Sequence, residues 1–278
     1  MGTGECVLKR LIVTGDDFGL SLPVNEAIEA AYENGILTTT CLMVAAPEAV
    51  DAVARARRLP GLAVGLHIVL VRGKPALPAA KIPALVGADG LFRSNLVGTG
   101  FRFFFSPAAR RQVAAEIRAQ FEAFRATGLS LDHVNAHNHM HLHPTVLGLI
   151  LKAGRDYGLS AVRLPLELAG GGIGAILLRP WTWLMKARLN RAGVRCNDYL
   201  FGMRDTGRMD RDHLLPVLRC LPDGVSELLC HPATGLWDGV EEQAAGFHFR
   251  DELNALMDSD IRAALEKSGA RLIAFRDI

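Results

Sequence analysis

Short apolar segments alternate with helix-period segments along almost the whole chain, and this alternation constrains the fold more than any other feature. Apolar runs bounded by turn residues predict strands, whereas apolar residues spaced three and four apart predict amphipathic helices. The predicted strands cover residues 10–15, 37–44, 62–68, 131–136, 160–165, 225–230 and 271–275, with a further one near 196–201. The predicted helices cover residues 22–34, 47–58, 107–126, 144–157, 211–220 and 251–268. Strands that alternate with helices predict a parallel sheet covered by helices.

The number of these units favours an irregular TIM-like (β/α) barrel over an open doubly wound sheet. No GxGxxG turn follows the first strand, which argues against a dinucleotide-binding fold. The chain has 278 residues, half of them hydrophobic, and α/β barrels of this size commonly form one domain. We therefore expect a single α/β domain over residues 1–278, with insertions at about 69–106 and 166–195 that cover one face.

Charge and cysteine content narrow the class of protein. The net charge is +2 and the basic residues are scattered, so we expect no nucleic-acid partner. The apolar run at 173–187 contains Arg179 and Pro180 and is too short to span a membrane. No secretory signal is recognised and no CxxC pair occurs, so we expect a cytoplasmic protein without sulfur-ligated zinc. The cysteines are Cys6, Cys41, Cys196, Cys220 and Cys230.

Five of the nine histidines lie within eleven residues of the segment LDHVNAHNHMHLHP. They are His133, His137, His139, His141 and His143. Neutral imidazole is the commonest metal ligand among side chains. If this segment is extended, the last four share one side, but His137 and His143 are then about 20 Å apart, so at most one or two of them bind one ion. A surface loop or a group of buried, hydrogen-bonded histidines is the alternative interpretation.

A pair of carboxylates, Asp16 and Asp17, follows the apolar strand KRLIVTG near the N-terminus. Adjacent carboxylates repel each other unless a cation lies between them or one of them holds a proton. Ser21 is the predicted N-cap of the next helix, so the pair is expected on a strand-to-helix loop. Two solvated turn aspartates are the alternative. The DFG letters also occur in protein kinases, but the chain has neither their Gly-rich loop nor an HRD motif.

Four predicted strands end in residues that can perform chemistry. Asp16 and Asp17 follow the first strand, His67 ends LAVGLHI, His137 follows DHVN, and His231 follows SELLC. Active sites of such barrels gather at the carboxyl ends of the strands. Taken singly, His67 would be a buried core histidine and His231 would close a turn before a proline. Together, these residues predict one active site.

These segments carry a resemblance to a known family. TGDDFGLS, AVGLH, DHVNAHNHMHLHP and LLCHPA resemble the YdjC-like carbohydrate deacetylases, and the similarity extends over nearly the whole chain. NAHNHMHLHP, in place of the DSHHHVH form of chitooligosaccharide deacetylases, is most similar to the branch associated with hopanoid biosynthesis. The resemblance implies a TIM-like barrel and removal of an N-acetyl group from an amino sugar. It also implies that Asp17, His67 and His137 hold one divalent metal ion, Zn or Mg.

The expected reaction follows from this ligand set. Two histidines and one carboxylate leave open positions on the metal for water and for the amide oxygen of the substrate. Asp16 would accept the proton of the water as general base, and His231 would protonate the departing amine. His139 or His141 could take the acid role instead. Outer partners for the ligand histidines are expected among Asn135, Asn138 and Asp132, although Asn135, Ala136 and Asn138 depart from the chitooligosaccharide form.

The substrate interpretation rests on the two insertions. FRFFF at 101–105 and LLRPWTWLM at 177–185 would place Phe103, Phe104, Phe105, Trp181 and Trp183 over the site. An apolar groove there would suit a hopanoid-linked N-acetylglucosamine and a transient contact with the inner membrane surface; alternatively, these residues pack the insertions onto the barrel.

Other functions left open are a chitooligosaccharide deacetylase, a metal-independent glycoside hydrolase with two carboxylates, and a non-catalytic metal-binding protein of lipid biosynthesis. A homodimer is also left open.

Overall fold

A curled parallel sheet forms the centre of the protein in the computed structural model, which describes residues 8–167, 173–240 and 244–278 and gives only the backbone of 173–179. The strand order is β4-β3-β2-β1-β6-β5, and β7 pairs with the start of β1. The strands are β1 (Lys9–Phe18), β2 (Thr39–Leu42), β3 (Ala63–Ile68), β4 (Leu131–Ala136), β5 (Tyr199–Phe201), β6 (Gly224–Cys230) and β7 (Arg271–Leu272). All of their pairings are parallel, as the alternation of strands and helices predicts.

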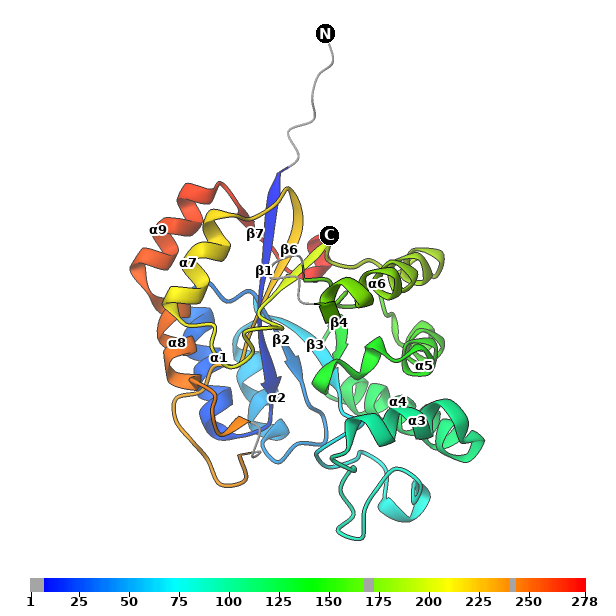
Figure 1. The fold of residues 1–278 in the computed structure, drawn as a ribbon. Helices are drawn as coiled ribbons and strands as arrows, with labels where there is room; N and C mark the ends of the chain where they lie inside the picture. The colour runs from blue at the N-terminus through cyan, green and yellow to red at the C-terminus, as the bar shows by residue number, and fades with distance from the viewer. Residues whose placement is uncertain (1–7, 168–172, 241–243) are drawn as a thin grey trace.

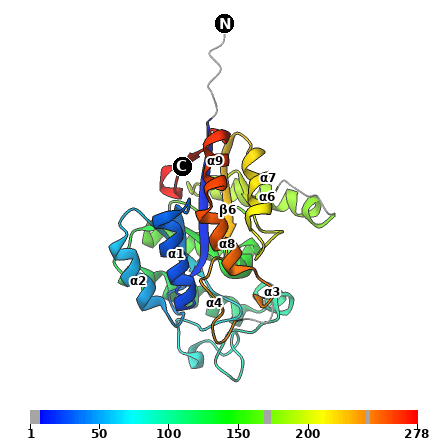
Figure 2. The same ribbon diagram turned by 90° about the vertical axis from the view of Figure 1, so that its left-hand side faces the viewer.

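Helices cover the outer face of this sheet (Figures 1 and 2). They are α1 (Leu22–Asn34), α2 (Ala49–Arg58), α3 (Leu96–Phe105), α4 (Pro107–Ala126), α5 (Pro144–Gly154), α6 (Ile173–Arg191), α7 (Arg211–Arg219), α8 (Phe249–Met257) and α9 (Ser259–Ser268). Short 3-10 turns occur at Ala79–Lys81, His137–Leu142, Arg155–Tyr157 and Phe275–Asp277. In Figure 1, α1, α2, α7, α8 and α9 lie on one side of the strands and α3 to α6 on the other.

The helix boundaries follow the capping residues. Ser21 caps α1 as predicted, because its side chain accepts a hydrogen bond from the Val24 backbone N–H. Helix α4 has the predicted bounds of 107–126. The predicted helix 251–268 is instead two helices, because Asp258 is extended and its carboxylate accepts from the N–H groups of Asp260 and Ile261. An aspartate in that conformation ends one helix and begins the next.

The sheet does not close into the predicted TIM-like barrel. Its two edge strands are β4 and β5, and the predicted strand 160–165 supplies only single bridges, from Val162 to β4 and from Ala161 to Arg195. One reason is the Asn197 side chain, which hydrogen-bonds both the N–H and the C=O of Leu164 in place of a backbone ladder. The described residues therefore form one α/β domain around a curled, open half-barrel.

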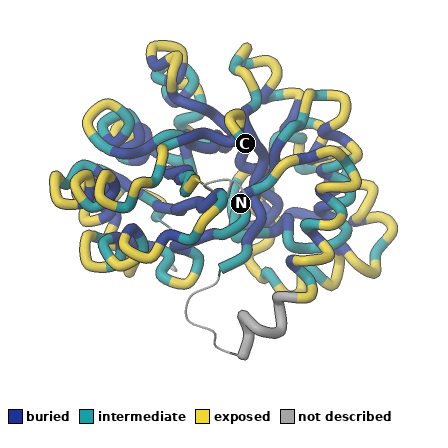
Figure 3. Tube along the Cα trace, turned by 90° about the horizontal axis from the view of Figure 1, so that it is seen from above, coloured by how far each residue is buried: buried dark blue, intermediate teal, exposed yellow. Residues whose placement is uncertain are grey.

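Two apolar clusters fill the two sides of the sheet. On β1, Leu11 and Val13 belong to the large core beneath the helices, whereas Ile12 belongs to a small cluster inside the half-barrel with Ala161, Val225, Ile273 and Phe275. Figure 3 shows buried chain at the centre and exposed segments around it. Because side chains alternate along a strand, Thr14 and Asp16 share the inner side with Ile12. The interior thus changes from apolar to polar toward the carboxyl ends of the strands.

The helices can also be compared with the length of a membrane crossing. Among the residues that the structure describes, no helix has the combination of length and apolar character that a membrane crossing requires.

Candidate active site

The carboxyl ends of β1, β3, β4 and β6 meet at a cavity of about 1100 Å³. Asp16, Asp17, His67, His137 and His231 all line it. The two aspartates lie in the last residues of β1 rather than in the predicted loop, and the register of β1 against β2 shifts between Gly15 and Phe18. Asp17 has a φ of 64°, so the strand bulges there and turns this carboxylate toward the histidines.

Asp17, His67 and His137 form a group with the geometry of a metal site. The Asp17 Oδ1 atom lies 3.2 Å from His67 Nε2 and 3.2 Å from His137 Nδ1, and the three ligand atoms lie within 4.8 Å of one another. Two ligands about 2.1 Å from a tetrahedral zinc ion would be about 3.4 Å apart. Burial alone would raise the pKa of Asp17, but His137 and His67 hold it well below its usual value. The donor set therefore fits one divalent cation.

Asp16 points inward to a buried arginine that the sequence analysis did not select. The Arg163 Nη1 and Nη2 atoms donate to Asp16 Oδ2 and Oδ1 at 2.7 and 2.8 Å, and neither side chain is appreciably exposed. Burial alone would raise the pKa of Asp16, but the charge and hydrogen bonds of Arg163 hold it far below its usual value. Asp16 is therefore ionised throughout the physiological range.

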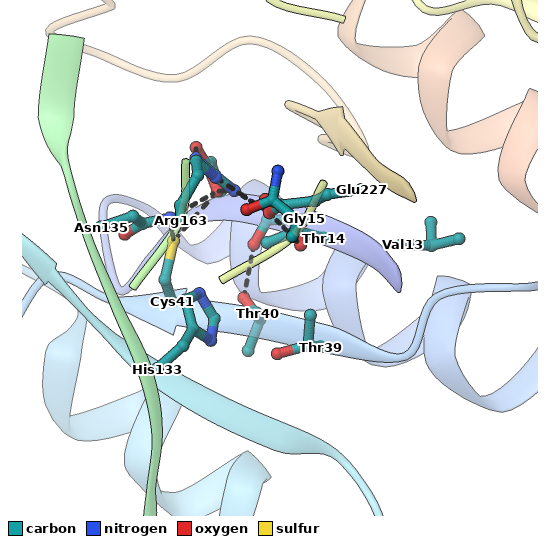
Figure 4. A network of polar contacts seen from close by, with 12 residues as sticks. Val13, Thr14, Gly15, Thr39, Thr40, Cys41, His133, Asn135, Arg163 and Glu227 are labelled. Atoms are coloured by element: carbon teal, nitrogen blue, oxygen red, sulfur yellow. Dashed lines mark hydrogen bonds and ion pairs between the residues drawn. The ribbon is translucent and has the colours of Figure 1, made fainter. Parts of the chain in front are cut away.

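The guanidinium of Arg163 also binds a second carboxylate (Figure 4). Its Nε and Nη2 atoms donate to Glu227 Oε1 at 2.8 and 2.7 Å, and Thr14 Oγ1 donates to the same oxygen at 2.7 Å. Buried charges are costly unless they are paired and hydrogen-bonded. This network pairs Asp16 with a buried cation and fixes it from inside the half-barrel, while Glu227 Oε2 meets no hydrogen-bond partner among the described residues.

The other nitrogen of His67 faces Asn135 and Cys41. The Nδ1 atom lies 2.7 Å from the Asn135 side-chain amide and 3.1 Å from Cys41 Sγ, which lies 3.0 Å from Asp16 Oδ1. Asp16, Cys41 and His67 thus form a second group with metal-ligand spacing. Because Arg163 already binds Asp16, a dication there would meet a positive charge, and the Asp17 group is the better site.

The His-rich run is a tight turn rather than an extended segment. His137–Leu142 forms a 3-10 turn in which Asn138 and His139 have φ values of 52° and 51°, in the left-handed region. The turn separates the histidines: His139 lines the cavity, whereas His141 is fully buried with Nε2 against the carbonyl of Arg163. Burial lowers the pKa of His139 to about 3, and it lowers the pKa of His141 well below 6.5.

His231 follows β6 directly and enters the cavity from the side opposite β3. Its backbone N–H donates to the buried carboxylate of Glu252 in α8, and its ring lies 5.5 Å from the Phe247 ring centre. Among the described residues, no hydrogen-bond partner meets its buried Nδ1 atom. Burial raises the pKa of Glu252. The backbone of His231 is thus fixed, and the residue lines the cavity.

Only one of the three expected outer partners touches a ligand histidine. Asn135 contacts His67, as predicted. Asn138 instead accepts from Arg72 Nη1, and Asp132 contacts His133, Thr39 and the backbone of Arg276. Asp132 lies near the start of β4, at the other end of the strand from His137.

The predicted aromatic groove is absent from the described cavity wall. Phe103 is fully buried in the core, Phe104 and Phe105 are exposed on α3, and the Trp181 Nε1 atom donates to the carbonyl of Leu142. Trp183 is 70 % exposed. The aromatic part of the cavity wall comes instead from Phe92 in the segment before α3, from Trp237 and Phe247 in the segment before α8, and from Phe249 at the start of α8. The insertion helices therefore lie beside the cavity rather than over it, and part of the 166–195 insertion lies outside the described residues.

Comparison with known proteins now identifies the family. A model of the family described as YdjC-like protein matches residues 10–267. The chain belongs to the YdjC-like family. Carbohydrate deacetylases of Geobacillus stearothermophilus and Mus musculus are 30% and 32% identical to it, over 96% and 97% of this chain and 96% and 94% of theirs. A solved Enterococcus faecalis V583 protein, named for a proposed cellobiose-phosphate cleavage activity, matches with a TM-score of 0.78 and 26% identity, over 97% of this chain and 98% of that one.

Three buried residues of this YdjC-like protein escaped the sequence analysis, although two of them had a signal. Arg163 interrupts the apolar run SAVRLP, and Glu227 interrupts GVSELLC. A charged residue inside an otherwise buried strand must be paired, so the two could have been matched as partners. Cys41 carried no such signal, because free cysteine is common in cores.

Proposed function

We propose that this protein is a metal-dependent carbohydrate N-deacetylase that hydrolyses the amide of an acetylated amino sugar. The observation that carries this proposal is the group of Asp17, His67 and His137 in the cavity, with the ionised Asp16 next to it in sequence and His231 across from it. The carbohydrate deacetylases among its relatives support the same reaction.

The proposed roles follow from the positions of the side chains. A divalent ion held by Asp17, His67 and His137 would polarise the amide carbonyl and acidify a water molecule. Asp16 would accept the proton of the attacking water. Because Arg163 keeps its pKa low, Asp16 is always ionised but is a weak base. Arg163 would thus make Asp16 a weaker base, but it would also keep Asp16 ionised and fix its orientation.

His231 is the best placed of the three histidines considered as general acid. His141 is fully buried and, among the described residues, is not part of the cavity wall. His139 lines the cavity, but its pKa of about 3 leaves it without a proton to donate at neutral pH. His231 lines the cavity at the end of β6, and its backbone is fixed by Glu252. We therefore assign the protonation of the leaving amine to His231.

For the substrate we propose a lipid-linked amino sugar, with hopanoid-linked N-acetylglucosamine as the leading candidate. The exposed face of α3 supports a lipid body: Val97, Phe101, Phe104 and Phe105 are 70, 63, 49 and 68% exposed and follow the cavity-lining residues 91–95. Residues 90–115 contain four arginines and no acidic residue. Aromatic and basic residues together favour contact with an anionic membrane surface.

The deciding experiment is acetate release from N-acetylglucosamine-containing substrates before and after removal of metal. Chelation should abolish release, and Zn²⁺ or Mg²⁺ should restore it. Sugar cleavage without acetate, persisting in chelator, would instead establish the glycoside hydrolase that the name of the Enterococcus faecalis protein suggests. Metal binding without turnover of any acetylated sugar would establish a non-catalytic protein.

The substrate class needs a separate comparison. We expect a higher kcat/KM for hopanoid-linked N-acetylglucosamine than for diacetylchitobiose, and co-sedimentation with anionic vesicles that Phe101→Ser and Phe105→Ser weaken. Trp183→Ser, which removes an equally exposed aromatic from α6, is the matched control. A clear preference for the soluble disaccharide would refute the lipid-linked substrate and leave the deacetylase reaction standing.

A further inference from the structure

Phe247 is an aromatic residue of the cavity wall that lies directly beside His231. It is half-buried in the segment before α8, and its ring centre is 5.5 Å from that of His231. The same ring packs against the ring of Phe249, 5.6 Å away, and Phe249 is buried in the core. Phe247 therefore rests on the hydrophobic core and presents the rest of its surface to the cavity.

Gly207, in the loop between β5 and α7, lies against the same ring. A Cβ atom at Gly207 would be 2.2 Å from the Cγ and Cδ1 atoms of Phe247, so any side chain there would displace the ring. The φ of Gly207 is 78°, which is also unfavourable for other residues. The N–H of His248 donates to the Gly207 carbonyl at 2.7 Å and joins the two segments beside the ring. The position of the Phe247 ring is thus built into the fold.

The proposed reaction brings the sugar to this ring. Hydrolysis breaks the bond between the carbonyl carbon and the nitrogen of the amide, and the nitrogen stays on the sugar as an amine. Because the nitrogen is bonded directly to the sugar ring, a substrate that receives its proton from His231 has its sugar on the His231 side of the broken bond. Phe247 lies next to His231 there. A pyranose carries hydroxyl groups around its edge, whereas its C–H groups form an apolar face that an aromatic ring can cover.

We propose that Phe247 is the platform on which the amino-sugar ring stacks, and that it determines specificity for a cyclic substrate. The proposal rests on the proposed deacetylase function, with His231 as the acid. The metal ligands, Asp16 and His231 act on the amide, which every N-acetyl compound contains, so these groups do not distinguish a sugar from another amide. An apolar surface that is fixed beside the acid makes this distinction, because a ring attached to the amide nitrogen covers it.

Steady-state kinetics of acetate release from diacetylchitobiose by the metal-loaded enzyme tests the platform. Phe247→Leu should raise KM about fivefold or more with little change in kcat, because it removes an aromatic contact that substrate and transition state share. Phe247→Tyr keeps the ring and should retain the wild-type KM. A fall in kcat at unchanged KM would show that Phe247 only supports His231, and would overturn the proposal.

Gly207→Ala tests the position of the ring while leaving the ring itself in place. It should raise KM as Phe247→Leu does, because the added Cβ displaces the ring. Gly128→Ala is the matched control: its φ of 75° imposes the same backbone strain, but a Cβ there meets no described atom within 4 Å. Equal changes of KM in the two alanine variants would refute the role of the fixed ring.

Saturation-transfer NMR of the metal-free protein with diacetylchitobiose provides a readout that does not depend on turnover. When the aromatic protons of the protein are saturated, the pyranose C–H protons should receive signal in the wild type and in Gly128→Ala. They should lose most of it in Phe247→Leu and Gly207→Ala. No transfer to these protons in the wild type would refute the platform without relying on any variant. Transfer without acetate release by the metal-loaded enzyme would support the platform as a sugar-binding site and refute only the deacetylase function.

Discussion

Replacement of Arg163 by methionine tests the buried charge network most directly. The side chain lies between Asp16 and Glu227, and all three are buried. Methionine keeps much of the length and removes the charge, so two carboxylates lose their cation. Breaking a buried pair in this way typically costs about 3–5 kcal/mol of the free energy of unfolding. We expect a loss of at least that size at pH 7.5, because the folded variant would then bury an ionised Asp16 without its cation.

The pH dependence of this loss distinguishes electrostatics from packing. In the wild type, the pKa of Asp16 lies below its unfolded value of 3.8, so its contribution to stability is constant above about pH 4 and is lost only in stronger acid. In Arg163→Met, burial is left to raise the pKa of Asp16. Asp16 then ionises at a lower pH in the unfolded chain than in the folded variant. The free energy of unfolding therefore falls as the pH rises above 3.8, by about 1.4 kcal/mol per unit of pKa shift.

Urea unfolding of both proteins at pH 5.0 and pH 7.5 measures this effect. The free energy of unfolding of Arg163→Met should be closer to the wild-type value at pH 5.0 than at pH 7.5. The value for Arg163→Lys, which keeps one charge, should fall between those of the two proteins. Arg118→Met is the matched control, because Arg118 also lies 2.7 Å from a carboxylate, that of Asp156, but both side chains are more than half exposed. We expect no measurable change for it. Equal losses in the two methionine variants, or a loss for Arg163→Met that is the same at both pH values, would refute the reasoning.

Three further predictions concern individual side chains. His137→Ala should lose bound metal by elemental analysis, since it removes one of three ligands, and full occupancy would exclude it from the site. Asp16→Asn should retain metal but lose about a hundredfold or more in kcat, because it removes the proposed base; near-normal turnover would transfer that role elsewhere. The wild-type free energy of unfolding should fall by about 2 kcal/mol between pH 7.5 and pH 5 from His141 alone, because the unfolded chain protonates near pH 6.5 while the buried ring stays neutral. His141→Asn should show a shallower pH dependence, and an unchanged one would show that His141 is protonated in the folded protein.

Periodicity and capping were enough to predict most of the architecture. Ser21 and the 107–126 helix lie where the sequence placed them, and the parallel sheet follows from the alternation of elements. The open barrel was not predictable in this way, because one reason for it is a side-chain contact. Asn197 occupies the hydrogen-bonding groups of Leu164 that a ladder would need, and an asparagine in a strand candidate gives no warning of that contact.

The positions of the site residues were predictable where those residues lie at the carboxyl ends of strands. Asp17, His67 and His137 come together because parallel strands deliver their carboxyl ends to one edge. The conformation of the His-rich run was not predictable, since its spacing of two suggested an extended chain. Asn138 and His139 adopt the left-handed region instead, and such residues are uncommon outside glycine. The tertiary contacts of that turn, rather than the local pattern, decide which histidines reach the cavity.

The two neighbouring aspartates at the end of β1 make the chemistry of this protein dependent on strand register. Asp16 faces the inside of the half-barrel and Asp17 faces the cavity histidines, because successive residues of a strand leave on opposite sides and the bulge adds a further turn. A slip of one residue would bring Asp17 against Arg163 and would present the apolar ring of Phe18 to His67 and His137. An insertion or deletion of one residue between Lys9 and Gly15 would therefore leave one of the two environments without a carboxylate. The length of β1 is therefore tied to the chemistry of the site.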